Sequence, residues 1–82
     1  MNRRDVFDAM VAAIREETDS PSARVEPAMT ANDIAGWDSL AHARIVMNIE
    51  ARTGAVIELS DTYKAATIGQ LCEIVMKALK SE

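Results

Sequence analysis

The chain has 82 residues, a formal net charge of −4, and one residue each of Trp, Tyr and Phe. A chain of this length buries only about 60% of the surface that it exposes when unfolded, so we expect residues 1–82 to form one small domain without an enclosed two-domain cleft. The acidic balance argues against nucleic acid as a partner, because phosphate contacts need clustered Lys and Arg.

Residues 2–18 predict an amphipathic helix with Asn2 as its N-cap. Residues 19–38 break this pattern, because Pro21 and Pro27 interrupt any helix. Such a long connection needs apolar anchors, which we expect to pack it across the helix ends. The apolar residues of the helix are Val6, Phe7, Met10, Val11 and Ile14, and the anchors of the connection are Val25, Met29, Ile34 and Trp37.

Residues 39–53 predict a second helix that ends at Gly54. Its apolar side is broad, so the helix is expected to be central and to contact more than one neighbour. The residues expected on the apolar side are Leu40, Ala43, Ile45, Val46, Met47 and Ile49. The residues expected on the opposite strip, open to solvent or to a partner, are Ala41, Arg44, Asn48 and Arg52.

The β-branched residues within residues 55–59 could form a short strand. Because nothing else in the chain supplies a strand to pair with it, we expect an extended connection with Ile57 and Leu59 turned inward. Residues 60–64 predict a short helical turn. Thr67 and Gln70 match a capping box that opens a last helix over residues 68–80. The sequence therefore predicts an all-α fold, a small four-helix bundle with three main helices and one short helix.

The turn before the second helix contains the most distinctive chemistry. Gly36 allows the chain to turn, and Asp38 is a good N-cap. Ser39 then falls on the first helical turn, where amide N–H groups and the helix dipole favour a negative group such as a phosphate ester.

Catalytic and metal sites find less support. A hydrolase would use Ser39 with His42 as base, but no oxyanion hole is evident. Carboxylates lack the spacing of a calcium loop, and Cys72 lies on an apolar helical face. We therefore predict no catalytic residue and no metal. No apolar run has the length of a signal peptide or membrane helix, which indicates a cytoplasmic protein without membrane contact.

Residues 36–40, Gly-Trp-Asp-Ser-Leu, resemble the Asp-Ser-Leu signature of acyl carrier proteins. Residues 40–50 resemble the second helix of that family, and residues 67–71 resemble the start of its last helix. The resemblance covers nearly the whole chain. It implies a stand-alone, non-catalytic carrier on which 4'-phosphopantetheine from coenzyme A is attached to Ser39 and holds acyl intermediates as thioesters.

The resemblance also implies partners. These are a phosphopantetheinyl transferase, an acyl- or aminoacyl-loading ligase or acyltransferase, and downstream synthase or transferase enzymes, all acting on a monomeric carrier. Asp38 and Leu40 would flank the attachment site and aid its recognition. The positions that the family uses for partner contact correspond here to Ala41, Arg44, Asn48 and Ile57.

The chain departs from fatty-acid carriers, which usually bear acidic residues along the second helix. Ala41 and Arg44 stand at such positions here, Arg52 is basic, and Thr53 replaces a common aromatic. Pairing with basic partner surfaces should therefore be weaker or rearranged. We expect a specialised polyketide or lipid pathway. An aminoacyl or peptidyl carrier, or an unmodified helical interaction module, remain alternatives.

Overall fold

The computed structural model describes residues 1–80, and this part of the chain is helical without strands. The helices are α1 (Arg3–Glu17), α2 (Ser39–Thr53), α3 (Leu59–Thr62) and α4 (Ile68–Lys80), with a short 3-10 turn, η1 (Ala31–Asp33), before α2. The predicted all-α bundle is confirmed. The short helix spans Leu59–Thr62 rather than residues 60–64, and the bounds of α2 are those predicted.

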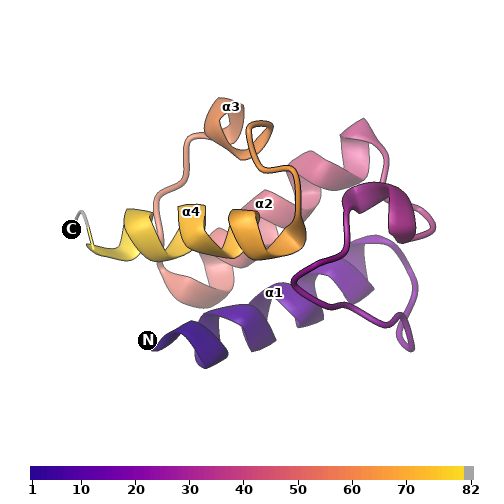
Figure 1. The fold of residues 1–82 in the computed structure, drawn as a ribbon, viewed down its shortest axis with the longest axis horizontal. Coiled ribbons are helices and arrows are strands. Elements are labelled where there is room, and N and C mark those ends of the chain that lie inside the picture. The colour runs from indigo at the N-terminus through magenta and orange to yellow at the C-terminus, as the bar shows by residue number, and fades with distance from the viewer. Residues whose placement is uncertain (81–82) are drawn as a thin grey trace.

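The core lies where α1, α2 and α4 meet, and α3 packs on α4 from above (Figure 1). Fully buried aliphatic side chains come from all three long helices, and each contributes about 1.5–3 kcal/mol relative to an exposed position. The largest of these side chains are Met10, Ile14, Ile45, Ile49, Ile68, Val6 and Val75. Because no two helices could bury this set alone, the three helices form one core.

Local sequence signals begin and end the helices as expected. The Asp5 amide donates to Oδ1 of Asn2 over 2.8 Å, and Gly54 closes α2 with a φ of 79°. At the start of α4, the Gln70 amide donates to Thr67 Oγ1, and Gln70 Oε1 accepts from the Ala66 amide. Gln70 thus reaches back one residue further than the predicted capping box.

The long connection between α1 and α2 is held against the bundle. The Met29 carbonyl accepts from the Ile68 amide over 2.8 Å, and the Pro27 carbonyl accepts from the Gly69 amide over 2.9 Å. The connection therefore satisfies amides at the start of α4 that have no partner within their own helix. Ile34 is buried, and Val25, Met29 and Trp37 pack against the core, which confirms the predicted anchors.

Helix α2 is rotated relative to the prediction. Ala41 was expected on the open strip but is only 5% exposed, whereas Leu40 and Met47 were expected inside and are 61% and 67% exposed. The reason is the position of α1. Asn48 and Arg52, on the same side of α2 as Ala41, bind the carboxylates of Glu16 and Glu17 at the end of α1.

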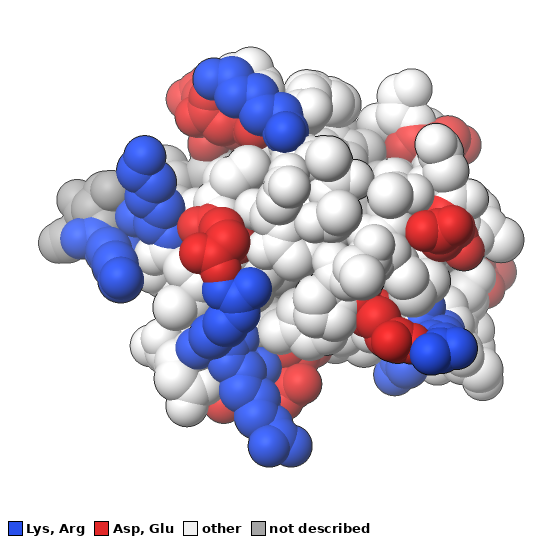
Figure 2. Space-filling model, viewed as in Figure 1, with Lys and Arg blue, Asp and Glu red and all other residues white. Residues whose placement is uncertain are grey.

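Leu59 also differs from the prediction, since it is 37% exposed at the start of α3, while Ile57 is buried as expected. On the face shown in Figure 2, blue and red side chains form separate small groups around a largely uncharged centre. Charges of both signs are therefore interspersed on this face. Any specific recognition there depends on local features rather than on an extended electrostatic potential of one sign.

Candidate functional site

The turn that leads into α2 is built around Gly36. Its φ is 86°, a conformation that other residues rarely adopt, and a Cβ atom there would lie 3.0 Å from the Thr18 carbonyl oxygen. Ile34, two residues earlier, is buried in the core. The turn is therefore held between the core and the end of α1, and this fixes where α2 begins.

Asp38 is the N-cap of α2, as predicted. Its backbone is extended, its Oδ1 accepts from the Ala41 amide over 2.8 Å, and its carbonyl accepts from the His42 amide over 2.8 Å. A cap of this kind contributes about 1 kcal/mol to helix stability. Asp38 thus stabilises the first turn of α2, and its side chain remains exposed next to Ser39.

Ser39 is the first residue of α2 and is exposed. Within residues 1–80, its hydroxyl makes no hydrogen bond, and the Ser39 and Leu40 amides have no acceptor. Two free N–H groups at the positive end of a helix favour an anion. The position therefore fits a phosphate ester on Ser39 Oγ, because the hydroxyl is accessible and unpaired amides lie next to it.

His42 links this turn to α3 through a chain of hydrogen bonds. The indole N–H of Trp37 donates to His42 Nδ1 over 3.1 Å, so the neutral imidazole carries its proton on Nε2. That Nε2–H donates to Thr62 Oγ1 over 2.7 Å, and the Thr62 hydroxyl donates to the Leu59 carbonyl over 2.6 Å. The ring of Tyr63 stacks on His42 with centroids 4.7 Å apart.

This arrangement argues against the hydrolase alternative. A general base must have a nitrogen free to take the proton of the nucleophile. Both ring nitrogens of His42 are engaged, one by Trp37 and the other by Thr62. His42 therefore serves to hold α3 against the start of α2. The sequence gave no signal for the contact of His42 with Thr62, which is 20 residues away in the chain.

The stability of the fold is expected to depend on the protonation of His42. Burial lowers the pKa of His42 below its ordinary value of 6.5, and a proton on Nδ1 would also remove the acceptor of the Trp37 N–H. The unfolded chain then binds more protons than the folded one between 6.5 and the lowered pKa. Stability should therefore fall as the pH drops below 6.5 and level off below the folded-state value.

Urea denaturation followed by circular dichroism between about pH 5 and pH 8 measures this dependence. His42→Gln is the matched variant, because His42 is the one histidine of the chain. It should be less stable than the wild type at pH 8 and should lose the part of the slope that His42 contributes. Equal slopes in the two proteins would contradict the prediction.

The residues predicted to contact partners do not form one surface. Ala41 is buried, and Ile57 is only 9% exposed. The side-chain amide of Asn48 donates to Glu16 Oε1 over 3.1 Å and to Glu17 Oε2 over 2.8 Å. Arg44 alone among these four residues is exposed. The sequence could not show this, because the side of α2 that α1 covers depends on packing between distant segments.

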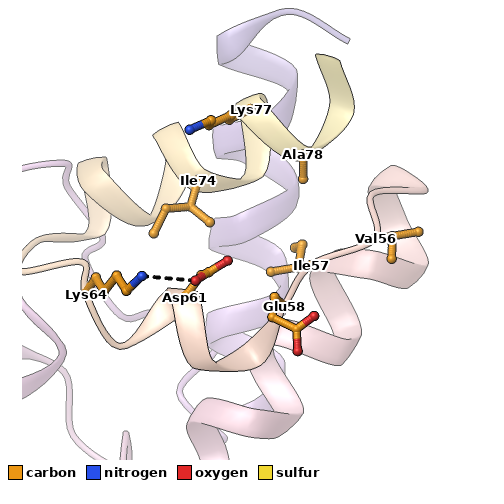
Figure 3. A pocket seen from close by; sticks show the side chains of 8 residues that line it. All are labelled: Val56, Ile57, Glu58, Asp61, Lys64, Ile74, Lys77 and Ala78. Carbon is orange, nitrogen blue, oxygen red and sulfur yellow. Dashed lines mark hydrogen bonds and ion pairs between the residues drawn. The ribbon is translucent and has the colours of Figure 1, made fainter. Parts of the chain in front are cut away.

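An open groove of about 640 Å³ lies between α3, α4 and the connection that precedes α3 (Figure 3). Ile57, Ile74 and Ala78 form its apolar side, and Lys64 Nζ and Asp61 Oδ1 pair over 3.3 Å at its edge. None of its lining residues comes from the turn before α2. The sequence gave no signal for this groove. In the part of the chain that is described, no helix has the length and apolar character needed to cross a membrane.

Comparison with known proteins shows that most of the chain is similar to one protein family and to a solved structure. Residues 8–75 match the family model described as the phosphopantetheine attachment site, and this segment includes Ser39. The fold is similar to the solution NMR structure of a holo acyl carrier protein from Geobacter metallireducens, with a TM-score of 0.79 and 29% identity. The match covers 93% of this chain and 87% of that chain. No curated protein matches the chain.

Proposed function

Because the chain belongs to the family of phosphopantetheine-binding carrier proteins, we propose that Ser39 is the residue to which its 4'-phosphopantetheine group is attached. Members of this family are carriers and not catalysts. The bound group supplies a terminal thiol that holds an acyl group as a thioester. The question for this chain is therefore which residues hold and present that group.

One observation carries the assignment to Ser39. Its exposed hydroxyl stands on the first turn of α2, beside amides that have no acceptor within residues 1–80. Ser60 is also exposed but lies in α3, a helix of only four residues, and its N-cap position makes no side-chain hydrogen bond. Of these two serines, only Ser39 is both exposed and located at the capped N-terminus of a long helix.

The surrounding residues support presentation of the group. Gly36 and the cap at Asp38 determine the direction in which α2 leaves the turn, and the bonds of Trp37 and His42 hold α3 beside it. A rigid base with an exposed attachment point lets a flexible tether raise the effective concentration of its cargo at successive enzymes. We propose that α1, α2 and α4, which share one core, act as a single carrier domain.

We also propose that the carrier serves a specialised polyketide or lipid pathway. The support is the outward face of α2, where the exposed Arg44 stands at a position at which carriers of fatty-acid synthesis usually bear an acidic residue. Support of the housekeeping elongation cycle as efficiently as by that cycle's own carrier would contradict this part of the proposal.

The attachment is tested by incubating the protein with coenzyme A and a broad-specificity phosphopantetheinyl transferase. The intact mass should increase by one phosphopantetheine, and peptide mapping should place the modification on Ser39. A thiol count gives a second reading. Cys72 is fully buried, and burial raises the pKa of its thiol, so the native protein should show no reactive thiol before loading and one after it.

No mass gain in a folded sample, with two transferases of different origin, would favour the alternative of an unmodified interaction module. A modification found on Ser60 or another hydroxyl would contradict the assignment to Ser39. Treatment with urea should expose Cys72 and add one thiol to the count in both forms, which provides an internal control.

A further inference from the structure

Helix α3 depends on the rest of the bundle for its stability. It has four residues, and the side chain of its N-cap, Glu58, makes no capping hydrogen bond. A helix of this length is not stable by itself, because its few hydrogen bonds do not offset the entropy lost in ordering the chain. The position of α3 is therefore set by contacts with other elements.

Hydrogen bonds hold the chain before α3, after it and at its centre. Before α3, the Ile57 amide donates to a carboxylate oxygen of α2 over 2.9 Å. After α3, the Ala66 amide donates to a side-chain oxygen of α4 over 2.8 Å. Between these two anchors, the Nε2–H of His42 donates to Thr62 Oγ1 over 2.7 Å. Loss of the central bond alone would free residues 58–65 to move while both ends stay attached.

The central bond is buried beside a small cavity. The Thr62 residue is only 1% exposed. The cavity has a volume of about 40 Å³, and Trp37, His42 and Thr62 line it together with Ile68 and Leu71 of α4. The bond therefore keeps α3 over an apolar part of the core, next to the turn that leads into α2.

A second proton on His42 disrupts this arrangement. In the neutral ring, Nδ1 accepts from the indole N–H of Trp37 over 3.1 Å, so the added proton is bound by that atom. Two N–H groups then face each other, and one side chain must turn. Trp37 packs against the core, whereas a charged imidazole gains hydration by moving toward solvent. The imidazole therefore turns, and because both nitrogens belong to one rigid ring, Nε2 moves away from Thr62.

The surroundings of His42 disfavour its charged form. The other residues that line the cavity are uncharged, and the ring of Tyr63 stacks on the imidazole. The Asp38 carboxylate accepts from an amide of α2, and Glu58 and Asp61 line the open groove between α3 and α4 (Figure 3). His42 also lies in the first turn of α2, where the helix dipole opposes a cation. Burial accordingly lowers the pKa of His42 below 6.5.

We propose that His42 is a proton-operated latch, which holds α3 against the start of α2 while it is neutral and releases residues 58–65 when it is protonated. The core of α1, α2 and α4 stays folded in both states, because the anchors at Ile57 and Ala66 do not involve His42. The closed state binds the proton less tightly than the open state does. The open population therefore rises as the pH falls below 6.5 and levels off below the closed-state pKa.

Nuclear magnetic resonance of the 15N-labelled full chain between about pH 5 and pH 8 tests the latch. The chain has one Trp and one His, so the indole and the imidazole each give a single set of signals. The Trp37 indole N–H, the His42 ring and the amides of Thr62 and Ala65 should titrate with one common midpoint below 6.5. The amide of Ile49, in the core, should keep its protection from hydrogen exchange throughout.

Thr62→Val removes the hydroxyl at nearly constant volume and should leave α3 released at every pH. At about pH 8, the protection of the Ala65 amide should fall about fivefold relative to the wild type, while the Trp37 indole still responds to His42. Ser60→Ala is the matched control, because Ser60 is an exposed hydroxyl residue of the same helix. It should change this protection less than about twofold and keep the pH response of the wild type.

Three results would overturn the latch. If His42 titrates but the amides of Thr62 and Ala65 do not respond, then the indole turns instead of the imidazole and α3 stays in place. If these amides and that of Ile49 lose protection together, acid destabilises the whole fold and does not open α3 locally. A midpoint at or above 6.5 would show that the closed state does not disfavour the proton.

Discussion

Ser39→Ala is expected to abolish the gain of phosphopantetheine completely in the presence of coenzyme A and transferase. The phosphate ester forms on the Ser39 hydroxyl, and alanine has no oxygen to accept it. The neighbouring residues cannot replace it, because Asp38 offers a carboxylate and Leu40 an aliphatic side chain. Intact mass spectrometry measures the result directly, and the thiol count should remain at zero in the native variant.

The variant should remain folded, which separates loss of attachment from loss of structure. Ser39 makes no hydrogen bond within residues 1–80, and the cap from Asp38 to the Ala41 amide does not involve it. We expect a change in the free energy of unfolding within about 0.5 kcal/mol. Ser60→Ala, at an exposed serine of α3, is the matched control and should be loaded like the wild type. Loading of Ser39→Ala, or its loss in Ser60→Ala, would contradict the assignment.

Ile45→Ala is expected to have the largest effect on stability. Ile45 is fully buried in the core between the three long helices, and truncation there removes apolar contact and leaves a cavity. Such changes cost about 2–5 kcal/mol, a large share of the 5–15 kcal/mol typical of a small domain. Urea denaturation followed by circular dichroism should show a strongly lowered midpoint, with substantial unfolding at physiological temperature.

Met47→Ala is the matched control on the same helix. Met47 lies two residues from Ile45 but is 67% exposed, so its truncation should change the free energy of unfolding by less than about 0.5 kcal/mol. The pair measures the orientation of α2. Comparable losses for both variants would mean that Met47 is inside, as the periodicity of the sequence suggested.

The amino-acid sequence by itself determined the helices and the local geometry of the site. Asn2, Asp38 and Gly54 act within one turn of the helix that each begins or ends, so their effects follow from neighbouring residues alone. Trp37 and Ile34 were correctly expected to anchor the long connection. The position of Ser39 on the first turn of α2 follows from the same local rules.

Only the tertiary structure decided which side of α2 faces outward. Apolar residues are spread around much of the circumference of this helix, so periodicity could not choose between Ile45 and Met47 as the buried side. The choice follows from α1, whose Glu17 binds Asn48 from 31 residues away. The bond from His42 to Thr62 likewise joins segments that no local pattern connects. Local capping and spacing act along the chain, whereas burial and pairing depend on which distant segments pack together.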